Sequence, residues 1–184
     1  MELDNTIQEM QLLGNNVVKE GKSILKRKNK TTRANTLHNE FDYLVTSNNT
    51  SVTLTFDFGK ASDYWMFVDE GVKGSGGFKG SGRMRGQGSL FRFRKKNIAK
   101  GVVEKWIANK PLKLRGSDGK FLAKTKNNIK SAAFLIGRAI AQRGLERTQF
   151  FSKPFTEELE KQSDAILDAF GNDLEKQLDL IIGN

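Results

Sequence analysis

The chain has 184 residues, of which 31 are Lys or Arg and 21 are Asp or Glu, so its formal net charge is +10. It contains no Cys and one His, which excludes disulfide frameworks, thiolate nucleophiles and multi-histidine metal sites. Neither paired carboxylates in an apolar setting nor a Ser beside a base can be found, so we expect no enzyme, no cofactor and no metal.

The N-terminal part of the chain predicts a helix followed by a hairpin. Apolar residues at helical spacing between residues 3 and 28 predict an amphipathic helix that Gly14 and Gly21 weaken. From Leu37 the period changes to two, and residues 52–58 alternate strictly between apolar and polar side chains. The Ser47–Thr50 segment between these runs predicts the turn of a β-hairpin that begins near Leu37 and has one apolar face. The lone His38 at the hairpin entry is expected to be a surface or turn residue.

The densest apolar cluster follows, and it predicts a short helix within residues 61–74. Ser62 or Asp63 is expected to cap this helix, and Gly71 is expected to end it. Four large apolar residues lie on one side of it: Tyr64, Trp65, Phe67 and Val68.

Residues 74–88 contain seven Gly and little that could be buried, so they predict a flexible loop. The segment lacks the Gly-Lys-Ser/Thr sequence of a Walker phosphate-binding loop. Its Gly-x-Gly pairs lead into a strand-like segment, whereas a dinucleotide-binding fingerprint leads into a helix. We therefore expect a loop that orders against a neighbouring subunit or nucleic acid. Residues 90–95 alternate Phe with Arg, which predicts a marginal strand with one aromatic and one basic face. Its Phe residues either join the core, which we favour, or stack on nucleic acid bases.

Three helices are predicted in the rest of the chain, at residues 97–109, 123–143 and 155–182. A basic connector at 112–120, with a turn at its Gly-Ser-Asp-Gly sequence, separates the first two. An extended anchor, Phe150–Pro154, precedes the last helix. That helix has acids opposite an apolar stripe of Leu159, Ile166, Leu167, Phe170, Leu174, Leu178 and Ile181.

The charge is unevenly distributed along the chain. Residues 155–184 hold eight acids and two bases, a net charge of −6, which leaves +16 for the first 154 residues. Residues 71–153 alone hold 21 Lys and Arg against three acids, a net +18. This asymmetry indicates either a basic surface for nucleic acid or complementary faces through which copies meet head to tail.

Two phrases, together with the order of the elements, resemble the tail-completion proteins of tailed bacteriophages, which are neck proteins related to tail terminators. One phrase, Tyr64-Trp65-x-Phe67-Val68-Asp69-Glu70-Gly71, resembles the family pattern Tyr-x-x-Phe-Val-Glu-x-Gly. The other, Arg147-Thr148-Gln149-Phe150-Phe151-Ser152-Lys153-Pro154, resembles Arg-x-Phe-Phe-x-x-Pro before the last helix. The resemblance covers the chain from Leu37 to the C-terminus.

This resemblance implies an α+β fold in which a small antiparallel sheet packs against helices and a long Gly-rich loop emerges. It implies a ring of six or twelve copies in the virion neck, around the DNA passage, joining the portal and adaptor proteins to the tail. We expect one domain, 1–184, made of an N-terminal helix (1–30), a hairpin and loop part (37–96) and a helical part (97–184). Assembly would take place in the host cytoplasm, without a membrane, because no apolar run approaches the ~18 residues of a transmembrane helix.

Two sets of site residues follow. The subunit or partner interface is expected to include Tyr64, Trp65, Phe67, Lys73, Phe78, Arg83, Arg85, Phe150 and Phe151. The residues expected to face DNA, through non-specific contacts, are Arg92, Arg94, Lys95, Lys96, Lys113 and Arg115. The alternative is a sequence-independent nucleic-acid-binding protein that uses the basic region 71–153.

Overall fold

The computed structural model describes residues 3–28, 36–48, 50–77, 83–95, 97–98, 101–109 and 112–182. Its described part has helices and small two-stranded antiparallel sheets, so the predicted α+β class is confirmed. The chain divides into two compact units. We call Met1–Asp69 with Thr148–Asn184 the terminal unit, and Glu70–Arg147 the central unit.

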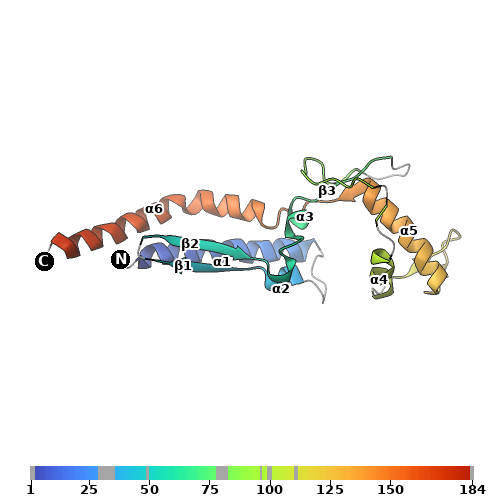
Figure 1. Ribbon diagram of the computed structural model, residues 1–184, viewed down its shortest axis with the longest axis horizontal. Coiled ribbons are helices and arrows are strands. Elements are labelled where there is room, and N and C mark those ends of the chain that lie inside the picture. Colours follow the sequence, from blue (N-terminus) through green and yellow to red (C-terminus); the bar gives the residue numbers. More distant parts are fainter. Residues whose placement is uncertain are drawn as a thin grey trace. The chain divides into compact units, whose positions relative to one another are not determined.

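The terminal unit is built around the long helix α1. Its elements are α1 (Asp4–Arg27), α2 (Thr36–Glu40), β1 (Asp42–Ser47), β2 (Val52–Asp57), the 3-10 turn η1 (Gly59–Ala61), α3 (Trp65–Asp69) and α6 (Ser152–Ile182). The hairpin β1–β2 and the helix α6 both lie along α1, as Figure 1 shows. The predicted N-terminal helix and hairpin are therefore confirmed.

The turn between β1 and β2 is held by the side chain of Asn48. Its Oδ1 accepts hydrogen bonds from the backbone N–H groups of Thr50 (2.9 Å) and Ser51 (2.8 Å).

The two glycines that weaken α1 have a packing role. A Cβ at Gly14 would overlap the ring of Tyr43, and one at Gly21 would overlap the ring of Phe41. These glycines therefore let the hairpin approach α1 closely.

The core of the terminal unit is aromatic. Phe41 is fully buried at its centre, stacked on Phe58 at a ring distance of 5.1 Å and edge-on to Phe150 at 5.5 Å. Phe58 also stacks on Trp65 at 4.2 Å.

The prediction that the first strand begins near Leu37 was wrong. Leu37 and Phe41 are both buried, and an N–H···O bond of 3.0 Å between them closes a helical turn, α2, before β1 starts.

The helix α6 begins three residues earlier than predicted. Asp69 Oδ1 accepts hydrogen bonds from the N–H groups of Phe151 (2.8 Å) and Ser152 (3.4 Å), so the carboxylate caps the helix at Ser152. Pro154 fits in the first turn, where its missing N–H costs no helical hydrogen bond. The predicted extended anchor therefore shortens to the two Phe before the helix.

The described residues of the central unit form two packed helices and two short strand pairs. Its elements are β3 (Val72–Lys73), α4 (Val102–Asn109), β4 (Leu114–Arg115), β5 (Phe121–Leu122), α5 (Lys126–Arg143) and β6 (Gly144–Leu145). The strands pair antiparallel, β3 with β6 and β4 with β5. The helices α4 and α5 pack around Val103, the fully buried Ile107 and Ala133. The helix predicted at 97–109 starts only at Val102, and α5 ends as predicted at Gly144, whose φ is +91°.

The Gly-rich segment differs from the flexible loop that was predicted, because both of its described ends are tied to α5. The N–H of Ser75 donates to Ala141 O at 2.9 Å, and the N–H of Arg85 donates to Arg143 O at 2.8 Å. A Cβ at Gly74 or Gly86 would overlap neighbouring backbone atoms. These glycines serve close backbone packing, whereas residues 78–82 lie outside the described part.

The marginal strand predicted at residues 90–95 is reduced to a single bridge. Arg92 pairs in parallel with Lys73, which donates to Phe91 O at 2.8 Å and accepts from the N–H of Phe93 at 2.9 Å. Phe91 and Phe93 are half-buried, whereas Arg92 and Arg94 are exposed, so the predicted alternation is confirmed.

Candidate interaction surfaces

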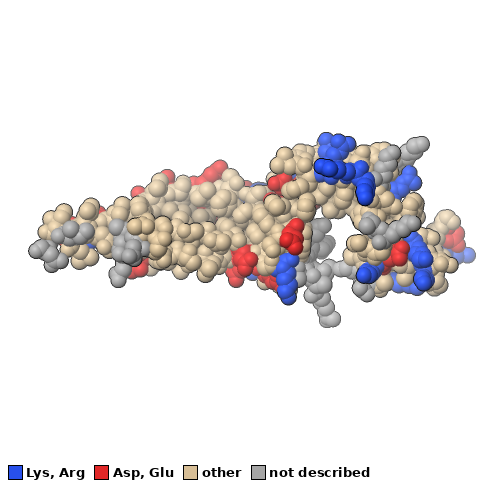
Figure 2. All heavy atoms as spheres, in the orientation of Figure 1, with Lys and Arg blue, Asp and Glu red and all other residues tan. Residues whose placement is uncertain are grey.

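The two units carry opposite net charges. The central unit holds 20 Lys and Arg against four Asp and Glu, a net +16, and the remaining 11 bases and 17 acids give the terminal unit −6. In the view of Figure 2, Lys and Arg gather over the central unit. The basic region 71–153 found in the sequence therefore nearly coincides with the central unit, so the charge boundary follows the boundary between the units.

The two phrases that carry the family resemblance meet in the terminal unit. The N–H of Thr148 donates to the carbonyl oxygens of Val68 (3.1 Å) and Asp69 (3.0 Å), and the Thr148 hydroxyl donates to Val68 O at 2.7 Å. With the Asp69 cap on α6, these bonds join the short helix α3 to the start of α6. The ring of Phe151 packs edge-on against Trp65 at 5.4 Å.

This packing separates the predicted interface aromatics into two groups. Phe150 is fully buried, and Trp65 and Phe151 are half-buried against the same core, so these three rings act mainly within the fold. Tyr64 and Phe67 are the exposed members, at 36% and 39%.

Most of the predicted basic residues are solvent-exposed. Those that the structure describes as exposed are Lys73, Arg83, Arg85, Arg92, Arg94, Lys95, Lys113 and Arg115. Phe78 and Lys96, which belong to the same predictions, lie outside the described residues.

The hairpin β4–β5 brings two of these bases to an exposed aromatic ring. Phe121 is 59% exposed, with Lys113 Nζ at 5.3 Å and Arg115 Cζ at 4.7 Å from its ring centroid. Such cation–π pairs hold the charges beside a flat apolar ring. The turn predicted in this connector is confirmed by a 3.0 Å bond from Gly119 N to Gly116 O, but its strands were not predicted. The hairpin offers the combination of charge and ring that nucleic-acid binding uses.

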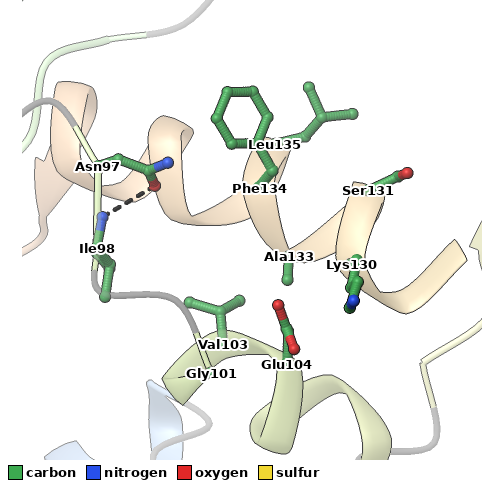
Figure 3. Close-up of a pocket in the computed structure, with 10 residues that line it drawn as sticks. All are labelled: Asn97, Ile98, Gly101, Val103, Glu104, Lys130, Ser131, Ala133, Phe134 and Leu135. Atoms are coloured by element: carbon green, nitrogen blue, oxygen red, sulfur yellow. Dashed lines mark hydrogen bonds between the residues drawn. The ribbon is translucent and has the colours of Figure 1, made fainter. Parts of the chain in front are cut away.

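A pocket of about 580 Å³ lies between α4, α5 and the segment before α4. Figure 3 shows Ile98, Val103 and Ala133 around its interior, with Glu104 and Lys130 on one side. Phe134, which also borders this pocket, projects from α5 away from α4. The pocket is largely apolar, so it suits a hydrophobic side chain better than a charged ligand.

A second cavity, of about 600 Å³, runs between α6 and β2 in the terminal unit. We call it the α6 groove, and it is lined by Met10, Leu13, Val52, Thr53, Leu54, Phe56, Phe151, Phe155, Leu159, Ser163, Ile166 and Leu167. Within the described part of the chain, none of the residues that line it is charged. Leu167 at its margin is 67% exposed.

The helix α6 buries a different set of residues from the apolar stripe that the sequence predicts. The buried residues of the described part of this helix beyond its first turn are Gln162, Ala169 and Asp173, whereas the apolar stripe that the sequence predicts is largely exposed. Leu178, farther along that stripe, is 56% exposed. The hydrophobic period identified the helix, but it did not identify the face that packs on α1.

Asp173 is the most informative titratable residue. Burial raises the pKa of its carboxyl group, but hydrogen bonds from the backbone and side chains of Thr6 and Asn5 lower the pKa by more, so the pKa lies below its ordinary value. A second shift involves a surface pair: the hydrogen bond and the charge of Lys161 lower the pKa of Glu158, and the same 2.6 Å contact raises the pKa of Lys161.

Among the described residues, no three His, Asp or Glu side chains come together in a way that could hold a metal ion. Within the same ranges, no helix combines the length and apolar character that crossing a bilayer requires. Comparisons with protein-family models, with curated proteins and with solved structures found no match.

Proposed function

We propose that this protein is a structural component of a tailed-phage virion, where copies form a ring in the neck that joins the portal and adaptor proteins to the tail around the DNA passage. The observation that carries the assembly part of this proposal is the opposite net charge of the two units, +16 and −6. The phage-neck part rests on the two sequence phrases.

Opposite charges on two units of one chain favour contact between unlike units of different copies. Such head-to-tail contacts are heterologous, and they generate a ring when the rotation between copies closes. Large exposed apolar side chains in both units, including Trp106 and Leu135 of the central unit and Leu167 of the terminal unit, supply surface that such contacts would bury. The excess positive charge that remains in the ring suits a position near DNA.

The test is the oligomeric state of the full chain, measured by sedimentation velocity and electron microscopy, alone and with portal and tail proteins. We expect a defined closed oligomer that forms without DNA, in six or twelve copies. A chain that stays monomeric both alone and with these partners would refute the proposal.

The β4–β5 hairpin favours a second candidate, sequence-independent nucleic-acid binding. Phe121 between Lys113 and Arg115 offers a stacking surface flanked by two phosphate-binding charges. A fluorescence-anisotropy titration with a short DNA would then give binding that weakens steeply with salt. Binding that is absent at low salt would eliminate this candidate.

A further inference from the structure

We propose that the exposed face of α5 in one copy docks into the α6 groove of a second copy, with Phe134 and Leu135 as the apolar residues that enter it. This inference deepens the proposed ring function and rests on it, because it names the two surfaces that form the contact. The occupant of the groove is thereby a second copy of this chain.

The α6 groove has the character of an incomplete core. The described residues that line it are uncharged, and they come from α1, β2, α6 and Phe151, the residue just before α6. Along α6 the helix buries Gln162 and Asp173 against α1 and leaves Leu167 and Leu178 exposed. The stripe residue Ile166 packs on the core, whereas Leu167 and Leu178 remain exposed, so the outer part of the stripe is a packing surface still to be covered.

The exposed face of α5 has the complementary character. The residues on this face, which recur at helical spacing and are all exposed, are Asn127, Lys130, Ser131, Phe134, Leu135 and Arg138. Phe134 is 51% exposed and Leu135 is 64% exposed. Ala133 packs α5 on α4, whereas Phe134 and Leu135, at the margin of the pocket beside α4, keep about half or more of their surface exposed to a partner.

Charges beside the two apolar surfaces have opposite signs. On α5, Lys130 and Arg138 lie four residues before and after Phe134, one helical turn away on each side. On α6, Glu160 and Asp164 lie seven and three residues before Leu167, which puts them on its side of the helix, and both are exposed. When Phe134 enters the groove, the two bases come close to the two acids. The two acids would repel an acidic peptide or a nucleic acid. They therefore favour a basic partner such as this face of α5.

The two surfaces belong to different units, so the contact leaves one groove and one α5 face free in every dimer. Copies can therefore continue to add in the same direction until the ring closes. Cross-links across this contact should therefore join more than two chains in a row, whereas a symmetric contact would join only two.

The native chain has no Cys, so introduced cysteines report on their own contacts alone. We would build the full-length double variant L135C/L167C and oxidise it under conditions in which the wild-type protein associates. The expected result is a reducible ladder of dimers, trimers and larger species on a non-reducing gel. Each single variant, L135C or L167C, should give no species larger than a dimer. The matched control is L135C/A165C, because Ala165 is exposed on α6 but points away from the groove side.

A second arm tests the charges. In the double-cysteine background, E160K/D164K should reduce the yield of the ladder by roughly tenfold, since two attractive pairs become repulsive. Adding K130E/R138E to the same chain should restore it. All four changes are at exposed positions, so far-UV circular dichroism should remain that of the parent protein.

Three results would overturn the inference: no ladder, a ladder of equal yield in the A165C control, or a disulfide confined to single chains, which would mean that the chain fills its own groove. None of these results bears on whether a ring exists, which electron microscopy of the wild-type protein decides. A ring without the ladder would remove the docking inference and leave the proposed function standing, whereas the absence of any oligomer would remove both.

Discussion

Replacing Asp173 with Asn tests whether one carboxylate of α6 anchors the N-terminus of α1. The residue before α1, Leu3, has no side chain that can cap the helix. Asp173 supplies the cap from 167 or more residues away: Oδ2 accepts from the N–H (2.9 Å) and hydroxyl (2.8 Å) of Thr6. Its Oδ1 accepts from the Asn5 side chain (2.7 Å) and backbone N–H (3.3 Å). Only 2% of Asp173 is exposed, so water cannot replace it.

The expected loss of stability follows from these bonds. A hydrogen bond to a charged acceptor contributes about 1.5–3 kcal/mol, and removing a helix N-cap typically costs about 0.5–2 kcal/mol. The Asn side chain keeps one acceptor oxygen, but the substitution removes the negative charge. The NH₂ group that replaces the second oxygen cannot accept the hydrogen bonds that Asn5 and Thr6 donate there. Because the four bonds share one carboxylate, their energies do not add fully. We expect Asp173→Asn to lower the free energy of unfolding by about 2–4 kcal/mol.

Urea unfolding at pH 7, followed by circular dichroism, measures this loss. The matched control is Asp168→Asn on the same helix, where the exposed side chain should change the stability by no more than about 0.5 kcal/mol. If the two variants unfold at the same urea concentration, the carboxylate does not hold α1, and the reasoning fails.

The pH dependence of the same comparison gives an independent test. The pKa of Asp173 is lowered below its usual 3.8, because the bonds from Thr6 and Asn5 outweigh the effect of burial. The unfolded chain therefore binds this proton more tightly than the folded protein does, and the charge stabilises the fold at any pH well above 3.8. The stability difference between wild type and Asp173→Asn should stay constant from pH 7 to pH 5. It should shrink as the pH falls from about 4 toward the lower pKa of the folded state.

Three further variants test the packing and the basic surface. Gly86→Ala should destabilise the central unit by about 2 kcal/mol or more in urea unfolding, because its φ is +64° and the new Cβ would overlap the Val72 backbone. The control is Gly77→Ala, which has a φ of +75° but open space around the new Cβ, so it should lose only about 1 kcal/mol of stability. Phe150→Ala should cost about 3–5 kcal/mol in the same assay, because it removes a fully buried ring that packs edge-on against Phe41. If DNA binds the β4–β5 hairpin, the double variant K113Q/R115Q should make the plot of log affinity against log salt shallower by about 1.8, and an unchanged slope would place DNA elsewhere.

The parts of the fold that the sequence predicts correctly are those in which local preference and packing agree. The helix α1 and the hairpin β1–β2 follow from apolar periods of 3.6 and 2. The end of α5 follows from Gly144, because only a residue that tolerates a φ of +91° can stop the helix there. The start of α6 does not follow from local signals, since its cap, Asp69, is more than 80 residues away in the chain.

The interaction surfaces were harder to predict because they depend on which side of a helix finds a neighbour. The pattern of α6 predicts that its apolar stripe is the buried one, yet the buried residues beyond its first turn are Gln162, Ala169 and Asp173. The competing interaction is the cap that Asp173 gives to α1, which no periodicity can reveal. The sequence predicts the helix that contains Phe134 and Leu135, but it did not identify these two side chains as exposed. In contrast, the exposure of Lys113 and Arg115 follows from charge alone.

The effect of different salts on self-association separates the two kinds of force in the proposed contact. The charge pairs between α5 and α6 are exposed at the margin of the groove, so raising NaCl from 0.1 to 1 M, which shortens the Debye length from about 10 to 3 Å, should screen them. The apolar contact of Phe134 and Leu135 is not screened, and sulfate strengthens such contacts by exclusion from the protein surface. Sedimentation velocity should therefore show association that weakens in NaCl and recovers in ammonium sulfate of equal ionic strength. DNA binding should fall in both salts, because it depends on release of counterions from phosphates. If association fell equally in both salts, the apolar groove would not be part of the contact, and the charges of the two units would be its only basis.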